Sequence, residues 1–224
     1  MTVIKKLINN LFDLVYPPVC GFCNQISNNF LCKECEQRFE KVKISVIDNN
    51  QNDSAFFDEH FYLFKYEDDI REKIIEYKFD EKSYLYKSFS ELFMRDEKFI
   101  NQFINNYDMI VSVPIHKKRF KYRGYNQSEL IAKDIAARCG KKYFKNVLTK
   151  KYNVVAQSSL CNKADRIKNI KDAFSEGEKI EFIKDKKVAI FDDVFTTGAT
   201  VNECAKVLKQ NGASFVGVFT IAKS

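Results

Sequence analysis

Glycine is scarce in this sequence of 224 residues, which contains only seven. No group of them forms a Walker loop or a G-x-G-x-x-G turn, the two arrangements in which glycine amides commonly meet nucleotide phosphates. Nucleotide binding through either motif is therefore excluded, and a phosphate site in this chain needs a loop of another kind.

Long apolar runs are also missing. No stretch approaches the roughly 20 apolar residues that a helix needs to cross a membrane. Apolar side chains recur at helical spacing over residues 3–15 and predict a helix there. Lys, Asn and Asp residues interrupt this run, unlike the apolar centre of a secretion signal. We expect a soluble, cytoplasmic protein without a membrane span.

The seven cysteines are not the even set that a disulfide framework requires. Four of them form two C-x-x-C pairs with eight residues between the pairs: Cys20, Cys23, Cys32 and Cys35. Each pair can present two thiolates to one ion, and two pairs complete the tetrahedron that Zn²⁺ prefers. We predict a structural zinc site, because four protein ligands leave no open position for catalysis. Buried free thiols and a redox pair are the alternatives.

The remaining composition is that of a folded protein. Hydrophobic residues make up 45% of the chain and aromatic residues 14%, which is ample for one packed core. The net charge of +7 favours anionic ligands or nucleic acid without requiring either. Segment 48–54 is polar and turn-rich, so we expect a linker there, between a helix and zinc ribbon at 1–47 and a larger domain at 55–224.

Apolar strands alternate with helical patterns in the larger domain. Strands are predicted over 61–66, 109–113, 188–191 and 215–221, and helices over 69–79, 83–94, 97–105, 127–138 and 200–210. A polar, basic loop is expected after residue 113. This alternation predicts an α/β fold, with a parallel sheet and helices on its faces.

The segment Val188–Thr200 runs from a buried strand through a turn into a helix. Asp192 and Asp193 lie where the strand ends, and ligands bind at that edge of open α/β sheets. Neighbouring residues of an extended chain point to opposite sides, so each carboxylate could meet sugar hydroxyls, or one could face Mg²⁺. Residues 196–200 offer amides, hydroxyls and a helix N-terminus to a phosphate. A capped turn without a ligand explains single pieces of this string but not the whole.

A second candidate segment is strongly basic. Five cations lie within Lys117–Arg123, interleaved with Phe120 and Tyr122. The segment could be a pyrophosphate clamp, a surface for single-stranded nucleic acid, or a solvated basic face. Its position directly after a sheet strand favours the clamp. Farther on, the long polar segment 156–169 is interpreted either as a lid or as an ordinary helix.

The string Val188–Thr200 resembles the thirteen-residue signature with which type I phosphoribosyltransferases bind phosphoribosyl pyrophosphate (PRPP). The resemblance implies that the acidic pair contacts the ribose hydroxyls, that the turn holds the 5′-phosphate, and that Mg²⁺ bridges pyrophosphate and ribose. The residues expected to bind PRPP and its phosphates are Val194, Thr196, Thr197, Gly198, Ala199, Thr200, Lys117 and Arg119. The residues expected to be catalytic are Asp192, Asp193, Arg123 and Arg166.

The wider pattern resembles the ComF, or GntX-like, competence family. It comprises Val-Pro-Ile-His and Arg-Gly-Tyr-Asn-Gln within 113–127, then Gln157, Arg166 and Asn169, then the signature, and it includes the four-cysteine knuckle. Tyr125 stands where Phe is usual. The resemblance implies a role in natural transformation, with PRPP, single-stranded DNA and a helicase-type protein as partners. We expect a PRPP-binding, phosphoribosyltransferase-like protein. The alternatives are a non-catalytic PRPP or nucleotide sensor and an adaptor that binds single-stranded DNA.

Overall fold

A computed structural model describes residues 19–49, 55–152, 170 and 172–224 of the chain. Its centre is a six-stranded sheet of order β1-β2-β8-β7-β3-β4. The strands are β1 (Val46–Asn49), β2 (Glu59–Lys65), β3 (Met109–Ser112), β4 (Lys142–Tyr143), β7 (Lys187–Phe195) and β8 (Phe215–Lys223). All neighbours are parallel except β1, which pairs antiparallel with β2. The predicted α/β class with a mostly parallel sheet is confirmed.

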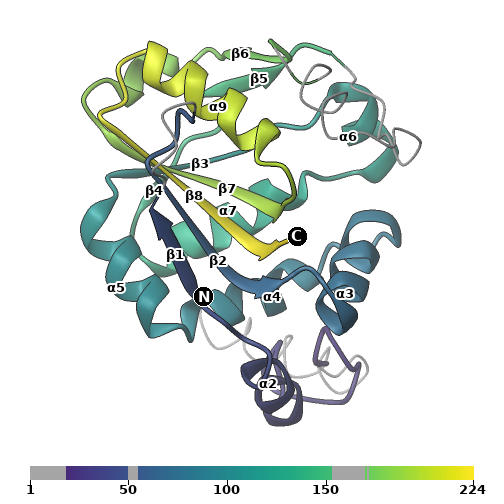
Figure 1. Ribbon diagram of the computed structural model, residues 1–224. Coiled ribbons are helices and arrows are strands. Elements are labelled where there is room, and N and C mark those ends of the chain that lie inside the picture. The colour runs from purple at the N-terminus through teal and green to yellow at the C-terminus, as the bar shows by residue number, and fades with distance from the viewer. Residues whose placement is uncertain (1–18, 50–54, 153–169, 171) are drawn as a thin grey trace, which may run out of the picture.

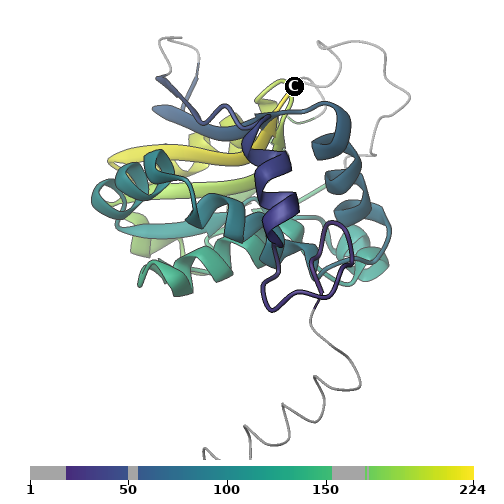
Figure 2. The ribbon, with the colours of Figure 1, turned by 90° about the horizontal axis from the view of Figure 1, so that it is seen from below.

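Helices cover both faces of this sheet (Figures 1 and 2). One face carries α3 (Asp68–Phe79), α4 (Leu85–Met94), α5 (Glu97–Asn106) and α7 (Gln127–Arg138). The other face carries α9 (Ala199–Gln210) and a small antiparallel sheet of β5 (Leu148–Lys150) and β6 (Phe174–Glu176), and the short η1 (Ile180–Ile183) follows β6. No helix of the described ranges is long and apolar enough to cross a membrane.

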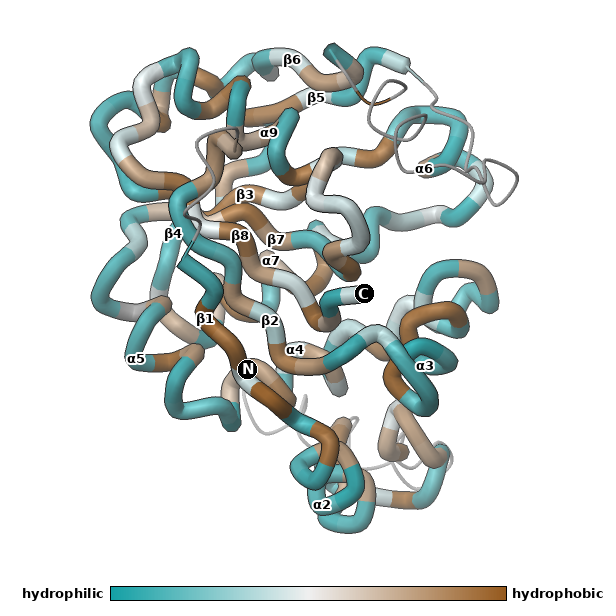
Figure 3. The backbone as a smooth tube through the Cα atoms, in the orientation of Figure 1, coloured by the Kyte–Doolittle hydropathy of each residue, from teal (hydrophilic) through white to brown (hydrophobic). Residues whose placement is uncertain are grey.

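The alternation of side chains along the strands builds two cores, one on each face. Phe191 and Phe219 stack on the face covered by four helices, with ring centroids 5.2 Å apart, and further phenylalanines of α4 and α5 pack against them. Burying each such ring contributes roughly 1.5–3 kcal/mol. Ile190 and Val218 line the α9 face. Strands buried on both sides are apolar in their central parts, as the brown colour there of β3, β7 and β8 shows (Figure 3).

Most predicted helices and strands are confirmed, and their observed ends differ from the predicted ones by one or two residues. The predicted strand over 188–191 was too short, since β7 continues to Phe195 by pairing with β8 as far as Lys223. The acidic pair therefore lies within a paired strand and is not in a free turn. The helix predicted over 3–15 and the lid or helix at 156–169 lie outside the described residues.

Two segments differ from the sequence expectation. The prediction of a basic loop after β3 is wrong in part, because Lys117–Arg123 forms the helix α6. His116 caps its start by accepting a hydrogen bond from the Lys118 amide, and Gly124 ends it at a left-handed φ of 82°. The expected linker begins inside β1, whose last two residues belong to segment 48–54.

The four-cysteine segment packs directly on α4. Gly21 lies so close that a Cβ there would stand 2.3 Å from Oγ of Ser88, and that hydroxyl donates to the carbonyl of Phe30 at 2.6 Å. Phe22 packs edge-on against Phe89 of α4, with ring centroids 5.2 Å apart. The knuckle thus shares the core of the larger sheet.

Candidate ligand site at the end of β7

The two acidic residues of β7 face opposite sides of the sheet and have different partners. Asp193 is buried, and its carboxylate accepts from Nζ of Lys78 at 2.7 Å and from Nε2 of Gln127 at 2.6 Å. The carboxylate of Asp192 accepts from Oγ of Ser128 at 2.9 Å and from the Asp193 amide at 2.9 Å. Asp193 is therefore neutralised by an ion pair, whereas Asp192 has hydrogen bonds but no cation within salt-bridge distance among the described side chains.

This difference shows in the protonation of Asp192. The pKa of Asp192 is raised to about 7, mainly by burial and also by the neighbouring Asp193 carboxylate, against the opposing effect of Lys78. A carboxyl group that is costly to ionise at the carboxyl edge of a parallel sheet is a typical mark of a ligand site. A cation or a set of hydroxyl donors arriving there would stabilise the ionised form.

The turn after the acidic pair packs against an aromatic side chain. Gly198 has a φ of 75°, and a Cβ there would lie 2.4 Å from Cζ of Phe195. The Phe195 ring is itself stacked on buried His60, with ring centroids 4.1 Å apart. Glycine is therefore required at this position for both its backbone angle and its lack of a side chain.

The turn leads straight into α9. The helix begins at Ala199, directly after the turn, and the Ala199 amide reaches Oγ1 of Thr197 at 3.4 Å. Thr196 is exposed, while Thr197 and Thr200 are half-buried at the start of the helix. The amides of a helix start carry partial positive charge, so this corner is suited to a phosphate group.

A chain of polar contacts joins α6 to the acidic pair. The Arg123 guanidinium donates to Oε1 of Gln127, whose amide nitrogen holds Asp193. Burial lowers the pKa of Arg123, an effect that the charge of Asp193 opposes. The Arg123 guanidinium also lies 5.4 Å from the ring centroid of Phe79, at the end of α3. Arg123 is therefore held beside the site.

The structure brings together most of the residues expected from sequence. Asp192, Asp193, Val194 and the 196–200 turn form one continuous segment, and Arg123 joins them through Gln127. Lys117 and Arg119 lie on α6, after the end of β3. Arg166 lies outside the described residues. The roles assigned to these residues stay predictions.

Three partners of the acidic pair were missed. Gln127 and Ser128 open α7 behind the N-cap Asn126, so the capping pattern placed them at a helix start without revealing their partners. Lys78 stands on α3, more than a hundred residues before Asp193, and no local pattern in the sequence marks it.

The four cysteines form a second candidate site. Their Sγ atoms all lie within 4.8 Å of one another, and those of Cys23 and Cys32 are 3.6 Å apart. Four sulfurs bound to one Zn²⁺ at about 2.3 Å stand about 3.8 Å from each other in a tetrahedron. Amides of Cys32 and Cys35 point at sulfurs of the set, at 3.4 Å each, as thiolates require. The cluster can therefore hold a metal ion such as zinc.

Comparison with known proteins gives sequence relatives but no match to a family model. Competence protein F of Haemophilus influenzae is 32% identical over 133 residues, 59% of this chain and 57% of that protein. DNA utilization protein YhgH of Escherichia coli K12 is 33% identical over 118 residues, 52% of this chain and 50% of that protein. Competence protein ComFC of Streptococcus pneumoniae is 26% identical over 208 residues, 86% of this chain and 87% of that protein. This chain spans about half the length of the first two relatives.

Similar solved structures include a glutamine PRPP amidotransferase from B. subtilis complexed with ADP and GMP. It has a TM-score of 0.40 and 19% identity, over 60% of this chain and 25% of that one. A purine phosphoribosyltransferase from Pyrococcus horikoshii has a TM-score of 0.35 and 14% identity, over 66% and 85%.

Fold and site together define an α/β protein with a strand–turn–helix signature at the carboxyl edge of its parallel sheet. Within this class, the relatives named competence protein F and ComFC confirm the predicted resemblance to the ComF family.

The raised pKa of Asp192 predicts a stability change with a defined sign. Between about pH 4 and pH 7 the folded chain binds a proton that the unfolded chain has lost, so folding stability falls as pH rises through this window. Asp192→Asn removes this loss. The free energy of unfolding of the variant minus that of the unchanged protein should therefore be larger at pH 8 than at pH 5, by roughly 1–3 kcal/mol.

Urea unfolding at the two pH values measures this difference. Asp185→Asn, an exposed change beyond the opposite end of β7, should show no such pH dependence. An equal effect of Asp192→Asn at pH 5 and pH 8 would contradict the raised pKa.

The cysteine geometry predicts one equivalent of zinc per chain by elemental analysis. Cys23→Ser should lose the metal and lower the thermal midpoint, because three ligands hold Zn²⁺ less firmly and the segment packs on α4. Cys139→Ser changes a cysteine outside the cluster and should keep the metal. A metal-free protein with the same thermal midpoint as the metal-bound protein would contradict this prediction.

Proposed function

We propose that this protein binds PRPP together with Mg²⁺ at the end of β7 and takes part in handling imported DNA. The observation that carries the proposal is the Val188–Thr200 segment. It supplies two carboxylates near the end of β7, of which Asp192 has a raised pKa, followed at once by a glycine turn and the start of α9. A phosphorylated sugar offers hydroxyls to the first part and a 5′-phosphate to the second.

Each group then has a definite task. Asp192 and Asp193 accept hydrogen bonds from the ribose hydroxyls, and the Lys78 and Gln127 contacts hold Asp193 in one orientation. The amides and hydroxyls of residues 196–200 hold the 5′-phosphate. Mg²⁺ supplies charge neutralisation for the pyrophosphate. Arg123, Lys117 and Arg119 add fixed positive charge on the same side, and Arg166 is proposed to join them.

The reaction that suits these groups is displacement at C1 of the ribose. A nitrogen nucleophile forms the new N–C1 bond while the C1–O bond to pyrophosphate breaks, and the pyrophosphate leaves with its electron pair. A PRPP or nucleotide sensor uses the same contacts without this step. Turnover of PRPP in the presence of candidate acceptors separates the enzyme from the sensor.

The biological setting is proposed from the relatives. Those proteins are named for competence and for DNA utilization. By likeness we place this chain in DNA uptake, in the cytoplasm, acting with a helicase-type partner on the incoming single strand. The zinc knuckle has a structural role in this proposal.

Calorimetric titration of PRPP with Mg²⁺ tests the site. We expect saturable binding to the unchanged protein, and a loss of at least tenfold in affinity, more than about 1.4 kcal/mol, in the double variant Asp192→Asn, Asp193→Asn. Both changes keep the shape of the side chain while removing its charge.

Asp185→Asn is the control and should bind like the unchanged protein. No binding by the unchanged protein would mean that the signature is an inherited scaffold. Equal binding by the double variant would place the ligand elsewhere.

Direct binding of single-stranded DNA is the second candidate function. The observation that favours it is α6, where Tyr122 is 85% exposed and Phe120 is 44% exposed among lysines and arginines. Phe79, 59% exposed, continues the aromatic surface next to Arg123. Bases stack on exposed rings while the strand backbone meets the cations.

Fluorescence anisotropy with a labelled oligonucleotide tests this surface. Affinity should fall steeply with salt concentration, and the slope should flatten in Lys117→Ala and Arg119→Ala. Tyr122→Ala should weaken binding by about 1–3 kcal/mol, whereas Tyr122→Phe, which keeps the ring, should not. A flat salt dependence would refute direct DNA binding.

A further inference from the structure

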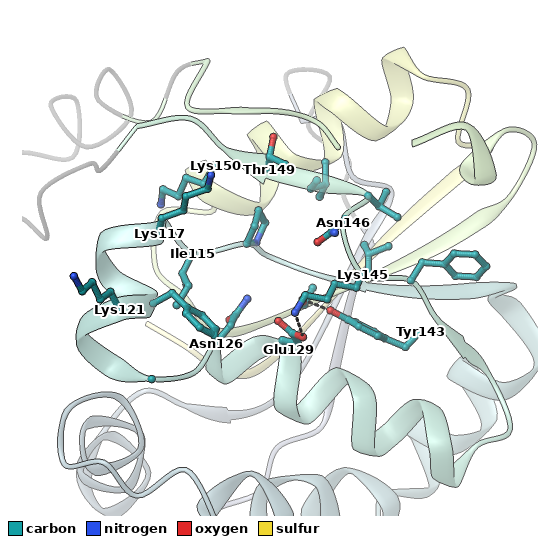
Figure 4. Close-up of a pocket in the computed structure, with 18 residues that line it drawn as sticks. Ile115, Lys117, Lys121, Asn126, Glu129, Tyr143, Lys145, Asn146, Thr149 and Lys150 are labelled. Carbon is teal, nitrogen blue, oxygen red and sulfur yellow. Dashed lines mark hydrogen bonds and ion pairs between the residues drawn. The ribbon is translucent and has the colours of Figure 1, made fainter. Parts of the chain in front are cut away.

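A second cavity lies beside the signature site, beneath β5 and against the outer edge of the sheet (Figure 4). Its volume is about 630 Å³, within the range of roughly 300–1,000 Å³ that small-molecule pockets occupy. Residues after β3, from α6 and from the segment between β4 and β5 line it. None of residues 192–200 lines it, so it is a separate space from the turn described above.

The cavity carries an excess of positive charge. Glu129 is the carboxylate that lines the cavity, and its Oε1 already forms ion pairs with Nζ of Lys133 at 2.6 Å and Nζ of Lys145 at 3.2 Å. Lys117 and Lys150 also line the cavity, at the end away from Glu129 in Figure 4. Within the part of the chain that the structure describes, neither has a carboxylate within ion-pair distance.

Lys150 is shielded from water as well. Burial lowers the pKa of Lys150, and the charge of Arg119 lowers it further. Its ammonium lies 4.9 Å from the ring centroid of Phe174, which stabilises the charge only weakly. Lys117 lies at the same end of the cavity in Figure 4. A doubly charged anion stabilises two such lysines, one of them desolvated, and a phosphate monoester carries that charge.

The rest of the wall is suited to a planar ring. Val111, Val147 and Leu148 are buried apolar residues that line the cavity. The Tyr143 ring lies at the end opposite Lys117 and Lys150. The Asn146 amide points into the space between them in Figure 4. A side-chain amide both donates and accepts hydrogen bonds, as the edge of a nucleobase requires.

We propose that this cavity binds a nucleoside 5′-monophosphate, with the phosphate between Lys117 and Lys150 and the base on the apolar wall beside Asn146. The lining of this cavity contains neither the acidic pair nor the 196–200 turn of the proposed PRPP site, and the two proposed sites share Lys117. Lys150 links the two electrostatically, since it lines the cavity and the Asp192 carboxylate raises its pKa against the effect of burial. Nucleotide bound here would therefore change the electrostatic environment of the acidic pair.

Calorimetry on the full chain with AMP, GMP and dTMP tests the proposal. Saturable binding at sub-millimolar concentration is expected. Adenosine lacks the phosphate and ribose 5-phosphate lacks the base, so each should bind at least tenfold more weakly than AMP. Equal affinity for ribose 5-phosphate would overturn the nucleotide class, and no saturable binding of any nucleotide would overturn the site.

Variants locate the binding. Lys150→Met removes the charge and keeps the side-chain length, and Asn146→Asp keeps the side-chain shape but replaces the amide by a negative charge. Each should weaken AMP binding at least tenfold. Lys142→Met, an exposed change on β4 outside the cavity, should leave it unchanged.

The Asp192→Asn, Asp193→Asn protein separates the two sites. It should still bind AMP although its PRPP binding is lost. If AMP binding disappears in this protein and survives in both cavity variants, the nucleotide occupies the signature site and the proposal is wrong. Circular dichroism of each variant establishes that it is folded.

Discussion

The buried carboxylate of Asp193 is the group on which the arrangement of the site depends. A charge in a low-dielectric interior is tolerated only when it is paired and hydrogen-bonded. Lys78 and Gln127 provide both, and they come from α3 and α7, two helices that also meet where the Tyr77 hydroxyl donates to the Gln127 carbonyl. One carboxylate therefore fixes two helices against the end of β7. The adjacent Asp192 lacks such a pair and is left responsive to its surroundings.

This division of roles explains why adjacent acidic residues on a strand are useful. Alternation of side chains sends one carboxylate to the four-helix face and the other to the α9 face, so their environments differ although they are neighbours in sequence. The Asp193 carboxylate is satisfied within the protein. The Asp192 carboxyl group, with its raised pKa, reduces the stability of the free fold near neutral pH, and a cationic or hydroxyl-bearing ligand offsets that cost.

The sequence was sufficient for features that are local. The signature at 188–200, the paired cysteines and the parallel sheet all follow from short patterns, and the structure has them where they were expected. Lys78 and the cavity at Lys150 could not be found this way, because each depends on contacts between distant segments. The error at α6 has another cause. A dense run of cations was taken as a loop, although lysine and arginine are good helix formers and Gly124 marks a helix end.

The edges of the sheet have a consequence of their own. A parallel sheet ends in strands with unpaired backbone groups, which invite edge-to-edge pairing with other chains and hence aggregation. Here one edge strand, β4, is two residues long and contains an exposed lysine, while the other, β1, runs antiparallel for four residues and ends in Asp48 and Asn49. Both edges are too short or too polar to serve as templates. A chain with so many phenylalanines can thus keep its apolar strands in the middle of the sheet and remain unavailable for strand exchange.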